Sequence, residues 1–183
     1  MYLGIDQSLR SSGVVVVGPK HEVVYRGTIT PGKLSGVARL ACIRNALRDV
    51  FAAEPDICFA ALEGYSMESV NRSFDLGELG GLVRLVLHDA AIPFAVVAPT
   101  SLKQFVSGDG SATKELMRQA VLKKWGMDFD QDDECDAYGL AQVARSLHLN
   151  VGTTRAELEV LKKLRNTEKK ITLVASSYSG ISI

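Results

Sequence analysis

Cysteine is scarce in this chain. Its 183 residues include only Cys42, Cys58 and Cys135. Their odd number and the lack of C-x-x-C spacing argue against both a disulfide framework and a zinc site. We therefore expect each cysteine to be a small buried hydrophobe.

Long hydrophobic runs are also missing. No apolar stretch approaches the ~20 residues that cross a bilayer. The amino terminus enters a strand pattern directly, without the charged and then apolar segment of a secretory leader. We expect a cytoplasmic protein with no membrane partner.

Neither sign of charge is in excess, because 21 Lys and Arg residues face 21 Asp and Glu residues. This balance neither supports nor excludes DNA binding, since clustered cations and bound metals can offset local negative charge. The hydrophobic share of 46% and the charged share of 23% are typical of a globular domain. The chain is long enough to bury a substantial core.

Apolar periodicity predicts an ordered series of strands and helices. The expected strands cover residues 2–6, 13–18, 22–29, 57–63 and 93–98. The expected helices cover residues 36–53, 74–91, 112–125 and 132–148. The order βββαβαβαα predicts an α/β protein with a ribonuclease H-like fold, a mixed five-stranded sheet flanked by helices on both faces.

Residues 151–183 are expected to form a C-terminal helix and tail extension of the domain in residues 1–150. Thr154-x-x-Glu157 is a capping-box pattern that opens a short helix. One face of that helix carries Leu158, Leu161 and Leu164. Residues 171–175 are compatible with an added edge strand.

Four acidic residues occupy positions that a fold can bring together. Asp6 ends the first strand, Glu63 ends a buried strand, and Asp133 and Asp136 lie three apart at the start of a helix. A carboxylate at the end of a buried strand loses hydration, which it avoids by pairing or by binding a metal. These acids predict one hard-cation site. The alternative for the helical pair is a solvated helix start, where acids suit the helix dipole.

Several motifs recur in order across roughly residues 2–148. They are Leu3-Gly4-Ile5-Asp6 followed by Arg10 and Gly13, then Glu63, Leu76-Gly77-x-x-x-Gly81, Lys103, Gly108-x-Gly-Ser-Ala-x-Lys114, and Asp133-x-x-Asp136-Ala137. In these motifs the chain resembles the RuvC family of Holliday-junction resolvases. The resemblance implies a nuclease domain in residues 1–150 that acts as a homodimer. It also implies symmetric cuts in branched DNA, above all the four-way junction.

The resemblance further implies roles for individual residues. Two Mg²⁺ ions, for which Mn²⁺ is expected to substitute, would be held by Asp6, Glu63, Asp133 and Asp136. The choice of Asp133 over Asp132 depends on the family spacing, because Asp132 and Asp136 also share a helix face. The implied catalytic lysines and DNA contacts are Lys103, Lys114, Arg118 and Arg10. Each of these cations is alternatively an ordinary surface residue.

The loop after Glu63 departs from the family pattern. Family members place an aromatic residue three positions after this glutamate, and this chain has Ser66 there. Tyr65 is the candidate to stack on a base, since stacking tolerates any sequence. Tyr65 and Phe74 can equally be core residues, and Phe74 is assigned no role.

The helix predicted at 74–91 contains Gly77, Gly80 and Gly81, and each costs about 1 kcal/mol relative to alanine. Small residues allow close helix approach, and the resemblance implies that subunits pair through this helix. The predicted dimer contacts are Leu76, Leu79, Gly80 and Val83. The alternative is packing within one subunit.

Three other functions remain compatible with the sequence to differing degrees. A catalytically inactive RuvC-like module that binds branched DNA is disfavoured by the complete set of acids, whose clustering costs repulsion. A broader ribonuclease H-like nuclease keeps the same residues. An actin-like ATPase half lacks support because no glycine-rich turn follows Asp6.

Overall fold

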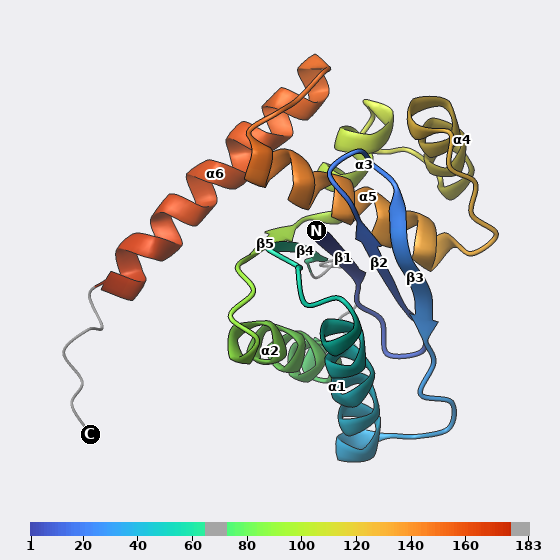
Figure 1. Ribbon diagram of the computed structural model, residues 1–183, viewed down its shortest axis with the longest axis vertical. Helices are drawn as coiled ribbons and strands as arrows, with labels where there is room; N and C mark the ends of the chain where they lie inside the picture. The colour runs from blue at the N-terminus through green and yellow to red at the C-terminus, as the bar shows by residue number, and fades with distance from the viewer. Residues whose placement is uncertain (65–72, 177–183) are drawn as a thin grey trace.

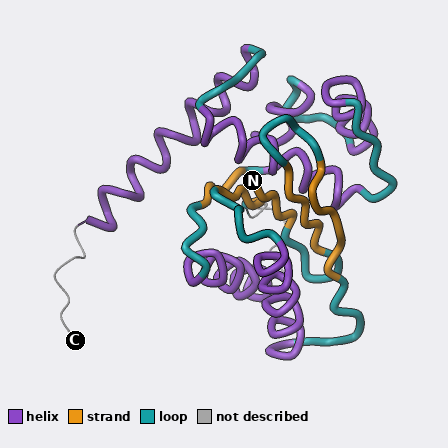
Figure 2. Tube along the Cα trace, viewed as in Figure 1, coloured by secondary structure: helices purple, strands orange, loops and turns teal. Residues whose placement is uncertain are grey.

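Five strands form one mixed sheet in the computed structural model, which describes residues 1–64 and 73–176. In Figure 2 the sheet lies between two groups of helices. The strands, in the sheet order β3-β2-β1-β4-β5, are β3 (Val23–Ile29), β2 (Ser12–Val17), β1 (Tyr2–Asp6), β4 (Phe59–Glu63) and β5 (Phe94–Val97). The first three strands pair antiparallel, whereas β4 pairs parallel with both β1 and β5. The predicted five-stranded mixed sheet is confirmed.

Helices cover both faces of this sheet (Figure 1). On one face lie α1 (Gly36–Ala53) and α2 (Ser73–Asp89). On the other lie α3 (Pro99–Ser107), α4 (Lys114–Trp125), α5 (Asp132–Leu149) and α6 (Arg155–Ser176). Side chains alternate along β1, so Leu3 and Ile5 join the core under α1 and α2, while Tyr2 joins the core under α5. Within the described residues, none of the helices combines the length and apolar character needed to span a bilayer.

The central helix α5 packs directly onto the backbone of β1 and β2. A Cβ atom added at Gly4 would lie 1.9 Å from the Ala137 carbonyl oxygen, and one added at Gly13 would lie 2.0 Å from the Asp133 carbonyl oxygen. Only glycine therefore fits at these two positions. Their lack of a side chain sets how closely the start of α5 approaches the end of β1, because Asp6 pairs with Gly13 across the sheet.

Two parts of the fold differ from the sequence prediction. Helix α3 was not predicted, although Pro99 at its first turn and the buried Leu102, Phe105 and Val106 are helix signals. The edge strand at 171–175 is wrong, because α6 continues through Ser176. No glycine or proline interrupts residues 155–176, so a short β-branched stretch does not end the helix. Figure 1 shows α6 running away from the sheet toward its C-terminal end.

Candidate active site

Two strand ends bring the first two acids together. Because β1 and β4 are parallel neighbours, their carboxyl ends lie at the same edge of the sheet. Asp6 ends β1 and is only 8% exposed, and Glu63 ends β4. The side chains of Asp6 and Glu63 lie within hydrogen-bonding reach of one another, and this contact acts to raise the pKa of Asp6 and to lower that of Glu63. The predicted convergence of these two distant residues is thus present in the structure.

Helix α5 brings the other two acids to the same edge. Its first turn lies against Gly13, the strand partner of Asp6. The negative charges of Asp136 and Asp133 both raise the pKa of Asp6. Asp132 instead pairs with two cations of α4, at 3.1 Å from Lys114 Nζ and 3.5 Å from Arg118 Nε. This arrangement favours Asp133 over Asp132 as the residue that acts with Asp6.

Burial and mutual repulsion shift the ionisation of the acid cluster, which we define as Asp6, Glu63, Asp133 and Asp136. Burial is the largest cause for Asp6, whose pKa lies well above its ordinary value. Burial also raises the pKa of Glu63 to about 7, with Asp136 adding to the rise. The pKa of Asp136 rises to about 6, again mainly through burial and in spite of Lys114. Near neutral pH the cluster therefore holds protons that a bound cation would displace.

The acid cluster fits a hard divalent cation by its chemistry. All four side chains offer carboxylate oxygens, which Mg²⁺ prefers as ligands. The negative charges of these acids repel one another and are not fully compensated by nearby cations. However, within residues 1–64 and 73–176 no three His, Cys, Asp or Glu side chains form a ready-made metal cage.

Two lysines flank the acid cluster from the neighbouring helices. Lys103 of α3 and Lys114 at the start of α4 both lower the pKa of Glu63 and of Asp136. Lys114 is exposed, and its hydrogen bond with Asp132 raises its own pKa. Gly108 ends α3 in the left-handed conformation, and the turn that follows leads into α4, whose first residue is Lys114. Both lysines thus interact electrostatically with the same two acids.

The remaining predicted DNA contacts are more peripheral. Arg118 is exposed and pairs with Asp132, as does Lys114. Arg10 is exposed in the connection that follows β1. Tyr65 and Ser66 lie outside the described residues. Phe74 is 89% exposed at the start of α2. It is therefore not a core residue of the single chain, which was one of the two possibilities that the sequence left open.

Sequence reasoning missed a polar residue beside the site. Gln7 Nε2 donates to the Glu63 backbone carbonyl oxygen at 2.6 Å and so ties the end of β4 to the residue after Asp6. Its position directly after the strand-ending acid was the available signal. Thr28 Oγ1 similarly donates to Glu134 at 3.3 Å, which joins the end of β3 to the first turn of α5. Both contacts position the acids without belonging to the cluster.

The predicted dimer residues lie mostly inside the single chain. Leu79 and Val83 are 0% and 1% exposed, and Gly80 is also buried. These residues pack into the core under α1 and α2, as expected if this helix face packs within one subunit. Leu76 is half-buried beside them. The face of α2 that is open to a second subunit instead carries Phe74, Gly81 and Leu85.

Comparison with known proteins identifies the family. The model of the family "Crossover junction endodeoxyribonuclease RuvC" matches residues 2–144. The chain belongs to the RuvC family. A RuvC of Chloroflexus aggregans is 32% identical over 146 residues, covering 76% of this chain and 88% of that protein. A RuvC of Anaeromyxobacter sp. (strain K) is 30% identical over 142 residues, covering 76% of this chain and 77% of that protein. Nucleases of the RuvC family are metal-dependent.

Solved RuvC structures share the fold. The structure of Thermus thermophilus RuvC aligns with a TM-score of 0.67 at 21% identity, covering 81% of this chain and 95% of that chain. T. thermophilus RuvC in complex with Holliday junction substrate aligns with a TM-score of 0.66 at 20% identity, covering 76% of this chain and 88% of that chain. The fold is therefore the ribonuclease H-like fold that the element order predicted.

Proposed function

We propose that this RuvC family member is a structure-selective endonuclease that resolves Holliday junctions and other branched DNA by phosphodiester hydrolysis. The observation that carries the proposal is the gathering of Asp6, Glu63, Asp133 and Asp136 at one sheet edge. A complete acid cluster argues against an inactive binding module, because four clustered acids without a catalytic cation cost repulsion. The protein works on DNA in the cytoplasm.

Two Mg²⁺ ions are the proposed cofactors, with Mn²⁺ able to replace them. Asp6, Glu63, Asp133 and Asp136 would hold them, and bound ions of this kind stabilise the charge on the attacking and leaving oxygens of a phosphodiester displacement. Lys103 and Lys114 bind the phosphate next to the acids. Lys114 acts as a mobile point charge, which exchanges its contact with Asp132 for a phosphate oxygen. Arg118 and Arg10 contact phosphates farther along the DNA.

The proposed assembly is a homodimer. A four-way junction has near two-fold symmetry, so two related active sites can make two matched cuts. We place the subunit contact on the exposed face of α2, where Phe74 is 89% and Leu85 is 57% exposed. Between them, a side chain added at Gly81 would meet nothing within 4 Å. This face leaves room for the close approach of a second helix. Leu76 borders it.

The test is cleavage of a synthetic four-way junction in Mg²⁺. Wild-type protein should produce paired nicks at symmetric positions. Asp6→Asn should bind the junction but cut it at least about 1000-fold more slowly, since lost metal stabilisation of several kcal/mol corresponds to such a factor. Asp49→Asn, the same change at an exposed position on α1, should cut normally.

Three outcomes would change the proposal. Equal cleavage by wild-type and Asp6→Asn protein would remove the metal assignment. Cleavage of linear duplex as fast as of the junction would replace junction resolution with a broader nuclease activity. Binding without any cleavage by the wild type would indicate the inactive module.

A further inference from the structure

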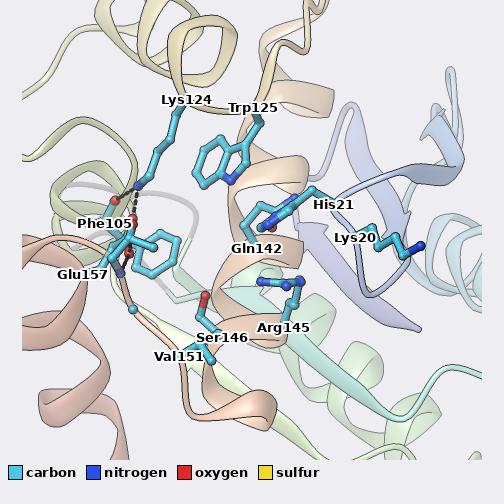
Figure 3. A pocket seen from close by; sticks show the side chains of 12 residues that line it. Lys20, His21, Phe105, Lys124, Trp125, Gln142, Arg145, Ser146, Val151 and Glu157 are labelled. Carbon is cyan, nitrogen blue, oxygen red and sulfur yellow. Dashed lines mark hydrogen bonds and ion pairs between the residues drawn. The ribbon is translucent and has the colours of Figure 1, made fainter.

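A cavity lies along the C-terminal half of α5, away from the sheet edge that carries the acid cluster (Figure 3). Its volume is about 510 Å³. It is lined by the β2–β3 turn, α3, the end of α4, α5 and the connection into α6. Asp136 and Arg145 lie on the same helix about 13 Å apart along its axis, given a rise of 1.5 Å per residue. The cavity is thus distinct from the acid cluster.

One wall of the cavity is cationic. It carries the charged Lys20 and Arg145, and the His21 ring lies beside them. Arg145 Nε donates to the Pro19 carbonyl oxygen at 2.7 Å, which fixes the orientation of the guanidinium. A guanidinium has five N–H donors, so this one bond leaves others for a ligand. Figure 3 shows Arg145 on the same side of the cavity as Gln142 and His21.

The turn that carries this wall is held in an unfavourable conformation. His21 has a φ of 70°, which is uncommon for a residue other than glycine. The His21 ring contacts Gln142, with 2.8 Å between His21 Nδ1 and Gln142 Oε1. The Tyr138 hydroxyl donates a hydrogen bond to the His21 carbonyl oxygen at 3.3 Å. A strained backbone conformation persists only where contacts with the surrounding structure enforce it. Such conformations are concentrated at functional sites.

Gln142 adds an independent observation. It is 1% exposed and lines the cavity. Its Nε2 is near enough to the Tyr138 hydroxyl to lower that group's pKa, although burial has the larger effect and raises it to about 12. Nevertheless, within the described part of the chain Nε2 has no hydrogen-bond partner of acceptable geometry. Gln142 therefore acts on the cavity through His21, whose ring it fixes at 2.8 Å.

The opposite wall is aromatic and electrically balanced. Lys124 forms an ion pair with Glu157, donates to the Phe105 carbonyl oxygen at 3.0 Å and lies 4.5 Å from the Trp125 ring centroid. Its charge is therefore already compensated. Trp125 supplies flat apolar surface on this side, facing Gln142 and Arg145 across the cavity (Figure 3), whereas the Phe105 ring is buried.

We propose that this cavity binds a nucleotide, with the phosphate at Arg145 and Lys20 and the base against Trp125. A cavity of this volume is within the range of small-ligand sites, and a cationic wall facing an aromatic wall matches a phosphate joined to a planar base. The ligand is either a free nucleotide or the 5′-phosphorylated end of a DNA strand, which share this chemistry. The proposal does not depend on the nuclease activity.

Trp125 is the chain's single tryptophan, so its fluorescence reports on the cavity directly. The full-length protein is titrated in EDTA with deoxyadenosine 5′-monophosphate, with deoxyadenosine and with inorganic phosphate. A short oligonucleotide is added with and without a 5′-phosphate. The nucleotide should change the fluorescence saturably, and deoxyadenosine should bind at least about 10-fold more weakly because it lacks the charge-assisted hydrogen bonds.

Variants decide whether the cavity holds the phosphate. Arg145→Met should weaken nucleotide binding at least about 10-fold, and Lys20→Met should weaken it in the same direction. Lys20→Met decides the matter if Arg145→Met does not fold. Arg48→Met on α1, on the far face of the sheet, is the matched control and should bind as wild type does.

The proposal fails if the nucleotide leaves the fluorescence unchanged up to millimolar concentration, or if the folded cavity variants bind as wild type does. Tighter binding of the 5′-phosphorylated oligonucleotide than of the mononucleotide supports a DNA end as the ligand. Equal or weaker binding of the oligonucleotide supports a free nucleotide.

Discussion

Asp6 is a carboxyl group held almost out of water beside three other acids. Its burial would be unfavourable in a residue that only ends a strand, because a desolvated carboxylate needs a partner. Burial and the neighbouring acids raise the pKa of Asp6, so a proton bound there relieves the repulsion. A divalent cation can replace that proton, so proton and metal compete for the same oxygens.

This competition predicts how stability depends on pH. The folded pKa of Glu63 is about 7 against an ordinary 4.5, and that of Asp136 is about 6 against 3.8. The folded state therefore binds protons more tightly than the unfolded state. Metal-free protein should lose about 2–3 kcal/mol for each of the two groups as the pH rises from about 4 to about 7, or roughly 10–20 °C in Tm for both together.

Thermal unfolding in EDTA and in Mg²⁺ checks this prediction. Mg²⁺ should raise the Tm at pH 8 and have little effect at pH 5, where the acids are protonated. Asp6→Asn should flatten the pH dependence in EDTA. An equal effect of Mg²⁺ at both pH values would contradict competition at these residues.

Among the elements, α5 has the largest influence on the active site, because it carries two of the four acids. Its position depends on Gly4 and Gly13, which leave no room for a side chain. The glycines lie on β1 and β2, while the acids lie far along the chain. The geometry of the active site is thus set by backbone contact between a helix and a sheet.

Gly13→Ala should move the start of α5 away from Asp6. The added Cβ would lie 2.0 Å from the Asp133 carbonyl oxygen, so the helix has to shift. We expect junction cleavage to fall by about 100-fold or more, since small misplacements of catalytic groups have effects of this size. Asp49→Ala, at an exposed position on α1, should keep full activity. Normal cleavage by folded Gly13→Ala would contradict this account of the site.

The start of α6 is fixed by the predicted capping box, which is confirmed. Thr154 Oγ1 accepts from the Glu157 N–H at 3.2 Å, and Glu157 Oε2 accepts from the Thr154 N–H at 3.3 Å. Glu157 is 3% exposed and also pairs with Lys124 of α4. Burial alone would raise the pKa of Glu157, but hydrogen bonds from Lys124 and Thr153 bring it below its ordinary value.

Glu157→Gln should therefore destabilise the protein by about 2–4 kcal/mol, because it leaves Lys124 half-buried without its counter-charge. Glu159→Gln is the matched control. Glu159 forms an exposed pair with Arg155, and its loss should cost less than about 0.5 kcal/mol. Chemical denaturation measures both values. Equal losses in the two variants would show that the ion pair with Lys124 contributes little.

For the whole molecule, the dimer proposal depends on the exposed face of α2. Leu85→Glu should weaken dimerisation about 10-fold or more, because it places a charge in an apolar contact. Leu122→Glu on α4, where the leucine is 48% exposed, makes the same change away from α2. Sedimentation at micromolar concentration compares the variants, and junction cleavage should change from paired to single nicks only in Leu85→Glu. A wild-type monomer that makes paired nicks would remove the two-fold argument.

The sequence by itself determined most of the secondary structure, and it led to the hypothesis of an acid cluster. Alternation in strands and the three-to-four residue period in helices are local signals, and an acid that ends an apolar run is visible in one dimension. These signals located Asp6 and Glu63 at strand ends and Asp133 and Asp136 on one helix. They failed at 171–175, where a β-branched stretch continues a helix.

Tertiary structure alone decided which neighbour each side chain meets. Asp132 and Asp133 are equivalent in spacing, and only the pairing of Asp132 with Lys114 and Arg118 separates them. Leu79 and Leu85 have similar side chains on one helix, yet the first is buried under α1 and the second is exposed. The spacing of apolar residues in the sequence shows that a helix has an apolar face and a polar face. The elements packed against the helix determine which side chains are covered.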